Sequence, residues 1–362
     1  MSMIWAMIAT FAIYLGGNIY LFIRLLQAVV ALPLWVRLLF SILFWLSAFA
    51  LFLALGLRNV AMPETVQRAL FTVGSVWLVF LLYAILSLLF CELISLWLPL
   101  PHHGVLYALA ATILLLAAGY INYRYPRVEQ LEIVTKNGEN GSSMRLVAIS
   151  DVHLGYGTTK ADLRRYVELI KAQKPDVVVI VGDLIDNSVK PVVADDMCSE
   201  FSHVHARMGV YMVAGNHEYI SGIHACESYL AKSSVRMLRD SIATLPNGVQ
   251  LICRDDRSNR ERATLATLVE RANTASPIIV LDHQPYDIAE SSRLAIDLHL
   301  SGHTHRGQVW PISWITDSLF EQSYGYRKWD NTHAYVSSGL SLWGPPFRIG
   351  TKSELVVIDL KW

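Results

Sequence analysis

The chain is poor in cysteine and carries no excess of charge of either sign. None of its four cysteines, Cys91, Cys198, Cys226 and Cys253, belongs to a CxxC pair. One lies in an apolar run and three are scattered through the polar remainder, which argues against a disulfide framework or a structural zinc site and fits a reducing compartment. The 30 basic and 30 acidic residues give a net charge of +0, so no basic surface indicates a nucleic-acid partner.

Charged residues are also scarce in the first third of the chain. Apolar stretches cover residues 4–23, 38–57, 69–98 and 105–121, and each is long enough, or nearly so, to cross a hydrocarbon core about 30 Å thick. The first lacks the charged segment of a signal peptide. A large soluble helical core would not leave residues 76–90 without charge on any face. The sequence therefore predicts a transmembrane domain of four helices in residues 1–122.

Arginines that flank these stretches predict how the domain is oriented. In short loops, arginine gathers on the cytoplasmic side of a membrane. Glu92, inside the third stretch, is expected at the interface or in the bundle interior, with a structural or a functional partner. The prediction is a multi-pass protein of the inner (cytoplasmic) membrane with a cytoplasmic C-terminal region. Arginines on that side are Arg58, Arg68, Arg124 and Arg127, against Arg24 and Arg37 opposite.

The chain turns polar after the fourth stretch. Residues 123–143 are predicted to form a linker and the leading strand of a soluble domain that occupies residues 144–362. Residues 136–141, Lys-Asn-Gly-Glu-Asn-Gly, carry a turn signal. Tyr120, Tyr123 and Tyr125 are placed to fix the depth of the fourth span at the membrane interface.

Short runs rich in Val and Ile recur in the soluble domain, and polar clusters follow five of them. Such runs predict buried strands, and residues 161–174 between the first two predict an amphipathic helix. This alternation is typical of a parallel α/β core, in which functional groups gather beyond the carboxyl ends of the strands. Residues 334–336 and 355–358 are expected to be strands of a second sheet layer. The clusters are Asp151-Val152-His153, Gly182-Asp183, Gly215-Asn216-His217-Glu218, Asp282-His283 and Gly302-His303-Thr304-His305.

These clusters offer carboxylate, imidazole and amide groups but no thiolate. That set suits divalent Mn, Fe, Zn or Co in a hydrolytic site. Two such ions, about 3.5–4 Å apart, would activate a water and clamp a phosphoryl group, and Asp183 is the natural bridging carboxylate. Each cluster alone could be an ordinary turn or loop. Five in order, each at a strand end, favour a functional site.

In this order the clusters resemble the calcineurin-like metallophosphoesterase family, over residues 144–360. The segment from Ser337-Ser338-Gly339-Leu340 to Trp343-Gly344-Pro345-Pro346 is similar to a bacterial membrane-associated branch, which includes an enzyme that cleaves UDP-diacylglucosamine. The resemblance implies an α/β fold, a four-layer αββα sandwich, with two divalent ions. It also implies that His217 acts as an acid or charge stabiliser beside the phosphate. The implied ligands are Asp151, His153 and His305 for one metal, Asp183 as the bridge, and Asn216, His283 and His303 for the other.

Substrate contacts are less well marked in the sequence. Arg254 and Arg257 could grip a phosphate or a nucleotide, or their polar stretch could be a solvated loop. Arg348 is a similar candidate, and Arg306 stands where many relatives have glycine, which places a cation beside the site. Asp183, Asp282 or another carboxylate is expected to orient His217.

The expected function is hydrolysis of a phosphodiester or pyrophosphate bond, in a lipid-linked substrate, by metal-activated water. Four spans are more than a dissolved substrate would require, and they could shape a route for a lipid. Two alternatives stay open at this stage. One is a membrane-tethered hydrolase of soluble nucleotides, and the other is a non-catalytic binding or receptor protein built on the metal fold.

Overall fold

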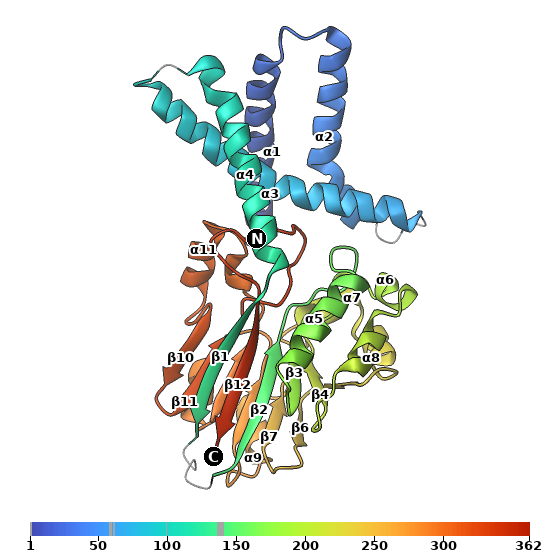
Figure 1. The fold of residues 1–362 in the computed structure, drawn as a ribbon, viewed down its shortest axis with the longest axis vertical. Helices are drawn as coiled ribbons and strands as arrows, with labels where there is room; N and C mark the ends of the chain where they lie inside the picture. Colours follow the sequence, from blue (N-terminus) through green and yellow to red (C-terminus); the bar gives the residue numbers. More distant parts are fainter. Residues whose placement is uncertain (1, 58–59, 61, 99, 136–140) are drawn as a thin grey trace. The chain divides into compact units, whose positions relative to one another are not determined.

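The protein divides into two compact units (Figure 1). The structure, a computed structural model, describes residues 2–57, 60, 62–98, 100–135 and 141–362. One unit comprises Met1–Ile121 with Gly344–Phe347, and the other comprises Asn122–Trp343 with Arg348–Trp362; below they are the helical unit and the α/β unit. Arg58 and the greater part of the predicted turn at residues 136–141 lie outside the described residues.

The helical unit is built from long apolar helices. Four of the described helices are long and apolar enough to cross a membrane, as the four sequence stretches predicted. The third begins earlier than expected, at Glu64, directly after Pro63. These helices are α1 (Ser2–Ala28), α2 (Leu34–Gly56), α3 (Glu64–Ser95) and α4 (Val105–Arg124).

Helix α3 packs against both α1 and α2. Leu21, Phe44 and Leu88 are among the residues of the shared apolar core. The backbones of α2 and α3 approach closely at Gly74, where an added Cβ would lie only 2.1 Å from the backbone nitrogen of Leu51. A small residue at this crossing is what lets two membrane helices pack with their backbones in contact.

Two pairs of polar residues lie inside the helical unit. Arg24 of α1 forms an ion pair with Glu92 of α3, and Trp77 donates from Nε1 to Asn18 Oδ1 over 2.8 Å. Asn18 in turn donates to the carbonyl of Tyr14. Such pairing is needed where no water can solvate a polar group. Glu92 therefore has a structural partner, the first of the two roles expected for it.

The α/β unit contains two six-stranded mixed sheets. The first has the order β1-β12-β2-β3-β4-β5 and the second β10-β11-β9-β8-β7-β6. Antiparallel neighbours are β12 with β2, β10 with β11, and β6 with β7. In chain order the strands are β1 (Arg127–Val134), β2 (Ser143–Ile149), β3 (Val177–Val181), β4 (Val210–Val213), β5 (Val235–Leu238), β6 (Ser241–Thr244), β7 (Gln250–Cys253), β8 (Ile278–Leu281), β9 (Leu298–Ser301), β10 (Gly325–Trp329), β11 (Thr332–Val336) and β12 (Glu354–Lys361).

The sheets pack face to face, and helices cover their outer faces. One apolar cluster joins residues of both sheets, such as Val179 and Ile279. A second joins the first sheet to α5 (Lys160–Ala172) and α8 (Ile223–Leu230), and a third joins the second sheet to α9 (Leu265–Glu270). The predicted four-layer αββα sandwich is confirmed (Figure 1).

Two expectations about secondary structure need adjustment. Helix α5 ends at Ala172, two residues before the predicted end, and Lys174 has a left-handed backbone with φ 52°. Residues 334–336 lie in the second sheet as expected, but the prediction that residues 355–358 do so is wrong. They belong to β12, which lies between β1 and β2 of the first sheet. Strand order depends on pairing between distant segments, which local sequence does not encode.

Candidate metal centre

The five polar clusters all follow the carboxyl ends of strands. Asp151 and His153 come after β2, Asp183 after β3, and the Asn216 cluster, after β4, begins α7 (Asn216–Ser221). In the second sheet, His283 follows β8 and the pair His303 and His305 follows β9. Because β2, β3 and β4 are parallel, as are β8 and β9, these ends meet at one edge of the sandwich.

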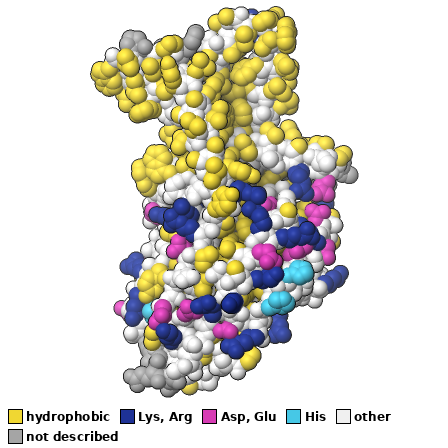
Figure 2. All heavy atoms as spheres, viewed as in Figure 1, with side chains coloured by type: hydrophobic (Ala, Val, Ile, Leu, Met, Phe, Trp, Pro, Cys, Tyr) yellow, Lys and Arg dark blue, Asp and Glu magenta, His cyan; other side chains and the backbone are white. Residues whose placement is uncertain are grey.

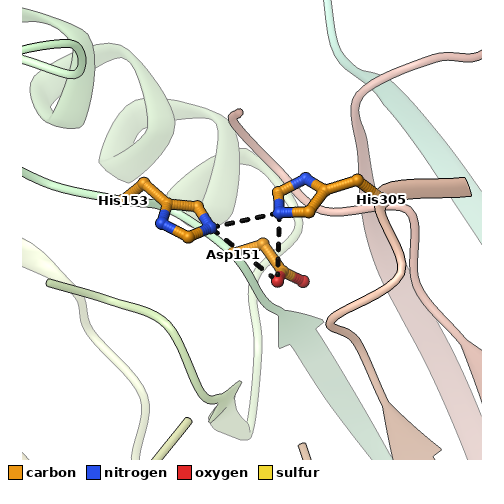
Figure 3. A group of neighbouring side chains, drawn as sticks. All are labelled: Asp151, His153 and His305. Atoms are coloured by element: carbon orange, nitrogen blue, oxygen red, sulfur yellow. Dashed lines mark hydrogen bonds and ion pairs between the residues drawn. The ribbon is translucent and has the colours of Figure 1, made fainter. Parts of the chain in front are cut away.

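Asp151, His153 and His305 form one group of side chains (Figure 3). The Nε2 atoms of the two histidines lie 3.1 Å apart. Asp151 Oδ1 is 3.4 Å from His305 Nε2 and 3.9 Å from His153 Nε2. Asp151 also accepts the backbone N–H of His303, which ties the loop after β9 to the loop after β2. Three atoms of the kinds that bind metals thus point toward one another from loops of the two sheets.

Asp183, His283 and His303 form a second group. Asp183 Oδ2 lies 3.1 Å from His283 Nε2, and Asn216 Oδ1 lies 3.2 Å from the same nitrogen. His303 is in edge-to-face contact with the His283 ring at 5.2 Å. The seven residues expected as ligands are therefore brought together, four of them here.

Asp183 lies between the two groups. The oxygen that faces His283 is also 3.7 Å from His153 Nε2. Burial opposes ionisation of this carboxyl, but His283, His217 and His153 around it hold its pKa well below the usual range. An ionised carboxylate between two imidazole groups is the position that a bridging ligand requires.

The proton on His283 is fixed by the backbone. Its Nδ1 lies 2.8 Å from the carbonyl oxygen of Val181, so Nδ1 donates and Nε2 presents a lone pair in the neutral ring. That lone pair then faces two further acceptors, the oxygens of Asp183 and Asn216. Burial acts to lower the pKa of His283, but Asp183 raises it well above its usual value. A proton on Nε2 therefore satisfies these contacts, and a metal ion could take the place of that proton.

The pKa values of His303 and His305 are shifted toward the neutral ring. Burial, reinforced by His153 and Arg348, lowers the pKa of His305 well below its usual value. Burial and the neighbouring His283 also lower the pKa of His303. Neutral imidazole is the form that binds metals. The donor set of carboxylate, imidazole and amide, without thiolate, fits divalent ions of the Mn, Fe, Zn or Co type.

His217 lies beside both groups, with Asp186 at its Nδ1. The distance from Nδ1 to Asp186 Oδ1 is 3.0 Å, and the His217 ring meets His153 edge to face at 4.6 Å. Burial acts to lower the pKa of His217, but Asp186, together with Asp183, raises it above the usual value. His217 also lies within 4.8 Å of His153 and Asp183, so its position allows either ligation or proton transfer.

Asp186 is a functional residue that sequence reasoning missed. It is buried, and it also lies 3.5 Å from Nδ1 of His153. Burial disfavours its charge, but its contacts with His153 and His217 lower its pKa. Asp186 therefore faces a ring nitrogen of both His153 and His217, the position from which a carboxylate can orient a histidine ligand. Its spacing of three residues from Asp183, on the same loop, was the available signal.

Glu218 braces the loops that carry the site. It is fully buried and accepts the backbone N–H groups of Asp183, Ile185 and Gly215. Burial and the nearby Asp183 raise its pKa to about 7. The sequence placed Glu218 in a cluster without a role; the structure shows that it joins the loop after β3 to the loop after β4.

The backbone of the site is unusual for residues other than glycine. Left-handed φ angles are uncommon and costly for L-residues, and they are retained mainly where function needs them. The loops reach them because the side chains must turn back over the strand ends. The residues and angles are Asp151 (53°), His153 (49°), Asp183 (53°), His303 (71°) and His305 (48°).

Two motif glycines lie directly against ligand-type carboxylates. A Cβ at Gly215 would fall 2.1 Å from Asp183 Oδ1, and one at Gly302 would fall 2.5 Å from Asp151 Oδ2. Neither position has room for a side chain while the carboxylate keeps its place. The glycines of these motifs are therefore explained by close approach.

Two of the four arginines expected to contact substrate are used inside the protein. Arg254 is buried, with one guanidinium nitrogen 2.8 Å from Asp282 and 2.6 Å from Asp287. Arg348 is buried as well and donates to the backbone carbonyls of His305 and Ser341. These interactions correct the expectation for both, because neither charge is presented to a ligand. Asp282 likewise pairs with Arg254 instead of orienting His217.

The other two arginines lie over aromatic rings. The guanidinium of Arg257 is 4.5 Å from the ring centre of Tyr286, and that of Arg306 is 4.5 Å from the ring centre of Tyr324. Arg257 is exposed and 3.7 Å from Asp287. Both cations keep access to solvent, so both stay candidates for substrate contact.

Trp343 is a further neighbour of the site. Its ring centre is 6.3 Å from that of His217, in an edge-to-face arrangement. Its Nε1 is buried and has no hydrogen-bond partner. A buried indole N–H normally has one. Trp343 thus brings an unused hydrogen-bond donor into the neighbourhood of His217.

Comparison with known proteins agrees with this geometry. Residues 144–307 match the family model described as calcineurin-like phosphoesterase. An uncharacterized metallophosphoesterase of Campylobacter jejuni is 30% identical over 249 residues, 65% of this chain and 63% of that protein. A transmembrane protein with metallophosphoesterase domain, from Danio rerio, is 34% identical over 272 residues, 70% of this chain and 62% of that protein.

The match does not extend over the whole of these relatives. This chain covers 63% and 62% of their lengths, less than two thirds of either. An uncharacterized metallophosphoesterase of Bacillus subtilis, 28% identical over 279 residues, is covered over 95% of its length and matches 71% of this chain. The sandwich fold, the order of its five polar loops and these likenesses show that the chain carries a calcineurin-like metallophosphoesterase domain, preceded by four helices of membrane-spanning length.

Proposed function

We propose that the protein is a membrane-anchored phosphoesterase that hydrolyses a phosphodiester or pyrophosphate bond of a lipid-linked substrate with the help of two divalent metal ions. The observation that carries this proposal is the convergence of ligand-type groups, from Asp183, Asn216 and His283, next to a second group around Asp151.

The two groups of side chains would hold one metal each. Asp183, which faces both, would be shared between them. When bound, such metals lower the pKa of a water and neutralise charge on phosphoryl oxygens. The first set comprises Asp151, His153 and His305, and the second Asn216, His283 and His303.

His217 would supply the proton that the leaving oxygen needs. Its raised pKa, which Asp186 and Asp183 cause against the effect of burial, favours the protonated ring. Asp186 holds Nδ1 and leaves Nε2 as the nitrogen that can reach a substrate. A positioned acid of this kind contributes about 10²–10⁴-fold to a rate.

The lipid part of the proposal is supported by how directly the chain passes from helix to sheet. Helix α4 ends at Arg124 and β1 begins at Arg127, which leaves Tyr125 and Pro126 between them. A tether this short holds a domain near the bilayer surface. The second candidate, hydrolysis of soluble nucleotides, is compatible with the same metal site.

A substrate comparison separates these two candidates. The full-length protein in liposomes would be given a UDP-linked acyl sugar and its delipidated analogue. We expect kcat/KM to be much higher for the lipid form. Equal values would favour the soluble-nucleotide candidate, and no hydrolysis of either, or of bis(p-nitrophenyl) phosphate, would favour a binding protein.

Orientation is a separate part of the proposal. The arginine bias supports a cytoplasmic C-terminus at the inner membrane, with Arg68, Arg124 and Arg127 on that side. A reporter that is active only in the periplasm, fused after Trp362, should therefore be silent. A strong periplasmic signal would reverse the orientation without affecting the metal site.

A further inference from the structure

The helix α11 (Ile312–Leu319) exposes its large apolar side chains and buries a polar one. On a soluble protein, a surface helix turns its apolar side chains inward. Here the small polar Ser313 is buried, while Trp314 and Leu319 are 65% and 66% exposed. Ile315 is 57% exposed as well. An outward apolar face is the property of a helix that lies in the plane of a membrane interface.

The exposed apolar residues of α11 share one side of the helix. At 100° per residue, Ile312, Ile315 and Leu319 fall within one arc, and Trp314 extends it. Asp317, the one charged residue of α11, hydrogen-bonds Ser323. Trp310 precedes the helix and packs edge to face with Trp314, with ring centres 5.3 Å apart. Tryptophan is enriched where a protein meets the headgroup level of a bilayer.

Contacts within the α/β unit link α11 to the end of the last apolar helix. Trp310 donates its backbone N–H to the carbonyl of Ile349 over 2.7 Å. On either side of Ile349, the carbonyls of Arg348 and Thr351 accept the side-chain amide of Asn122, over 2.9 and 2.7 Å. Asn122 lies near the C-terminal end of α4. The exposed apolar face is therefore fixed close to the point where the chain leaves a membrane-spanning helix.

The same helix adjoins the metal centre. It packs against the short helix η4 (His305–Gly307), and an added Cβ on Gly307 would lie 2.5 Å from the backbone nitrogen of Ser313. Phe320, directly after α11, is 6.2 Å from the His303 ring and 4.9 Å from that of Tyr286, centre to centre. Aromatic side chains thus continue from the apolar face to a metal-binding histidine.

We infer that Trp310 and α11 form a membrane-contact surface that lies in the lipid interface and presents the metal centre to the phosphate of a lipid in that leaflet. The occupant of this surface is the bilayer itself. The outward apolar face and the fixed closeness to the end of α4 favour lipid over a second protein. Arg306, next to His305 and over the Tyr324 ring, would face anionic headgroups. The surface deepens the proposed function, and its link to a lipid substrate rests on that function.

A lipid-quenching experiment tests the surface without needing any activity. Ile315→Cys, in the full-length protein in nanodiscs, would carry an environment-sensitive fluorophore; the four native cysteines are buried. A share of the lipid would bear a nitroxide near the carboxyl end of its acyl chain. We expect a blue shift and a marked loss of emission. The matched control is Ala275→Cys, at an exposed residue before the amino end of β8, which should keep its emission.

Each other outcome would overturn the inference. A label at Ile315→Cys that stays in a polar environment means that the face is in water. A label that shifts to the blue but is not quenched is covered by protein, either another part of this chain or a second copy. Equal quenching of both labels would mean that contact with lipid is not specific to α11.

An activity measurement then connects the surface to the substrate. The double change Trp314→Ser with Ile315→Ser should lower kcat/KM roughly tenfold or more for a lipid-linked substrate in liposomes. Hydrolysis of soluble bis(p-nitrophenyl) phosphate should be unchanged, which shows that the variant is folded. Equal loss on both substrates would overturn the link to lipid. Quenching in a protein without any hydrolysis would instead overturn the proposed function and leave the surface standing.

Discussion

The two units treat their buried polar groups in opposite ways. In the helical unit, Arg24 pairs with Glu92, and Trp77 with Asn18, so donors meet acceptors. In the α/β unit, carboxylate, imidazole and amide groups converge around His283, where a proton or a metal ion lies among them. The first arrangement stabilises the packing of the helices, and the second forms a site that a cation can occupy. Burial of polar residues therefore does not by itself indicate a binding site. A cluster in which several ligand-type groups converge does.

Their surfaces differ in the same direction. The helical unit exposes large apolar side chains such as Trp35, Leu38 and Ile42, while charged residues are spread over the visible face of the α/β unit (Figure 2). Helix α11 of the α/β unit resembles the helical unit, because it too exposes large apolar side chains. An apolar surface of this kind suits hydrocarbon, and a charged one suits water.

The largest effect is expected for a change of Asp183, the carboxylate that faces both groups of ligand-type side chains. Asp183→Asn should abolish hydrolysis and lose more metal than any other single change, because it removes the carboxylate shared by both groups. Elemental analysis and turnover of bis(p-nitrophenyl) phosphate measure the two effects. Asp195→Asn, at an exposed residue, serves as the control. Full metal content, about two ions per chain, in the Asp183→Asn protein would remove Asp183 from the bridge.

His217→Ala distinguishes a catalytic histidine from a ligand. We expect kcat to fall by roughly 10²–10⁴ while the metal content stays near that of the wild type. His224→Ala, at an exposed histidine of α8, should change neither. Joint loss of metal and activity would place His217 among the ligands, as its closeness to His153 and Asp183 also allows.

Gly74→Ala tests the packing of the helical unit. The added methyl would meet the backbone of Leu51, and overpacking of this kind costs about 1–3 kcal/mol. The midpoint of thermal unfolding in detergent should fall. Gly16→Ala is the matched change, since no atom lies within 4 Å of its Cβ. If both variants unfold at the wild-type temperature, α2 and α3 do not meet at Gly74.

Trp343→Phe should have the smallest effect. The change keeps an aromatic ring, although a smaller one, and removes the unpartnered N–H near His217; a neutral hydrogen bond contributes about 0.5–1.5 kcal/mol. We expect KM to rise a few-fold, with kcat and thermal stability almost unchanged. Trp35→Phe, on the exposed face of α2, is the control. An unchanged KM would mean that the substrate does not use this donor.

The metal centre was readable from the sequence because each cluster stands directly after a buried strand. Parallel strands bring such positions to one edge, so Asp151 and Asp183, which follow neighbouring strands of one sheet, could be placed together. That His283 of the second sheet joins them was implied only by the family resemblance. Asp186 could not be assigned in this way. Its contact with His217 depends on how the loop after β4 packs against the loop after β3. Glu218 joins these two loops by accepting backbone N–H groups from both.

The arginines show where sequence reasoning ends. Arg254 and its neighbours had the composition of a solvated or ligand-binding loop, and only the fold reveals that Asp282 and Asp287 neutralise Arg254. Tyr123 was expected to anchor a helix in the interface, but it is buried, near Ser341. Both cases depend on partners that are far away in the chain.

The left-handed residues of the metal centre have a consequence for evolution and engineering. At Asp151, His153, Asp183, His303 and His305 a glycine would relieve the backbone, but it would remove the side chain that the chemistry needs. Selection for a heat-resistant fold and selection for turnover therefore pull in opposite directions at these positions. A library screened for stability alone would be expected to drift toward inactive proteins there, whereas the paired polar residues of the helical unit would be kept by both screens.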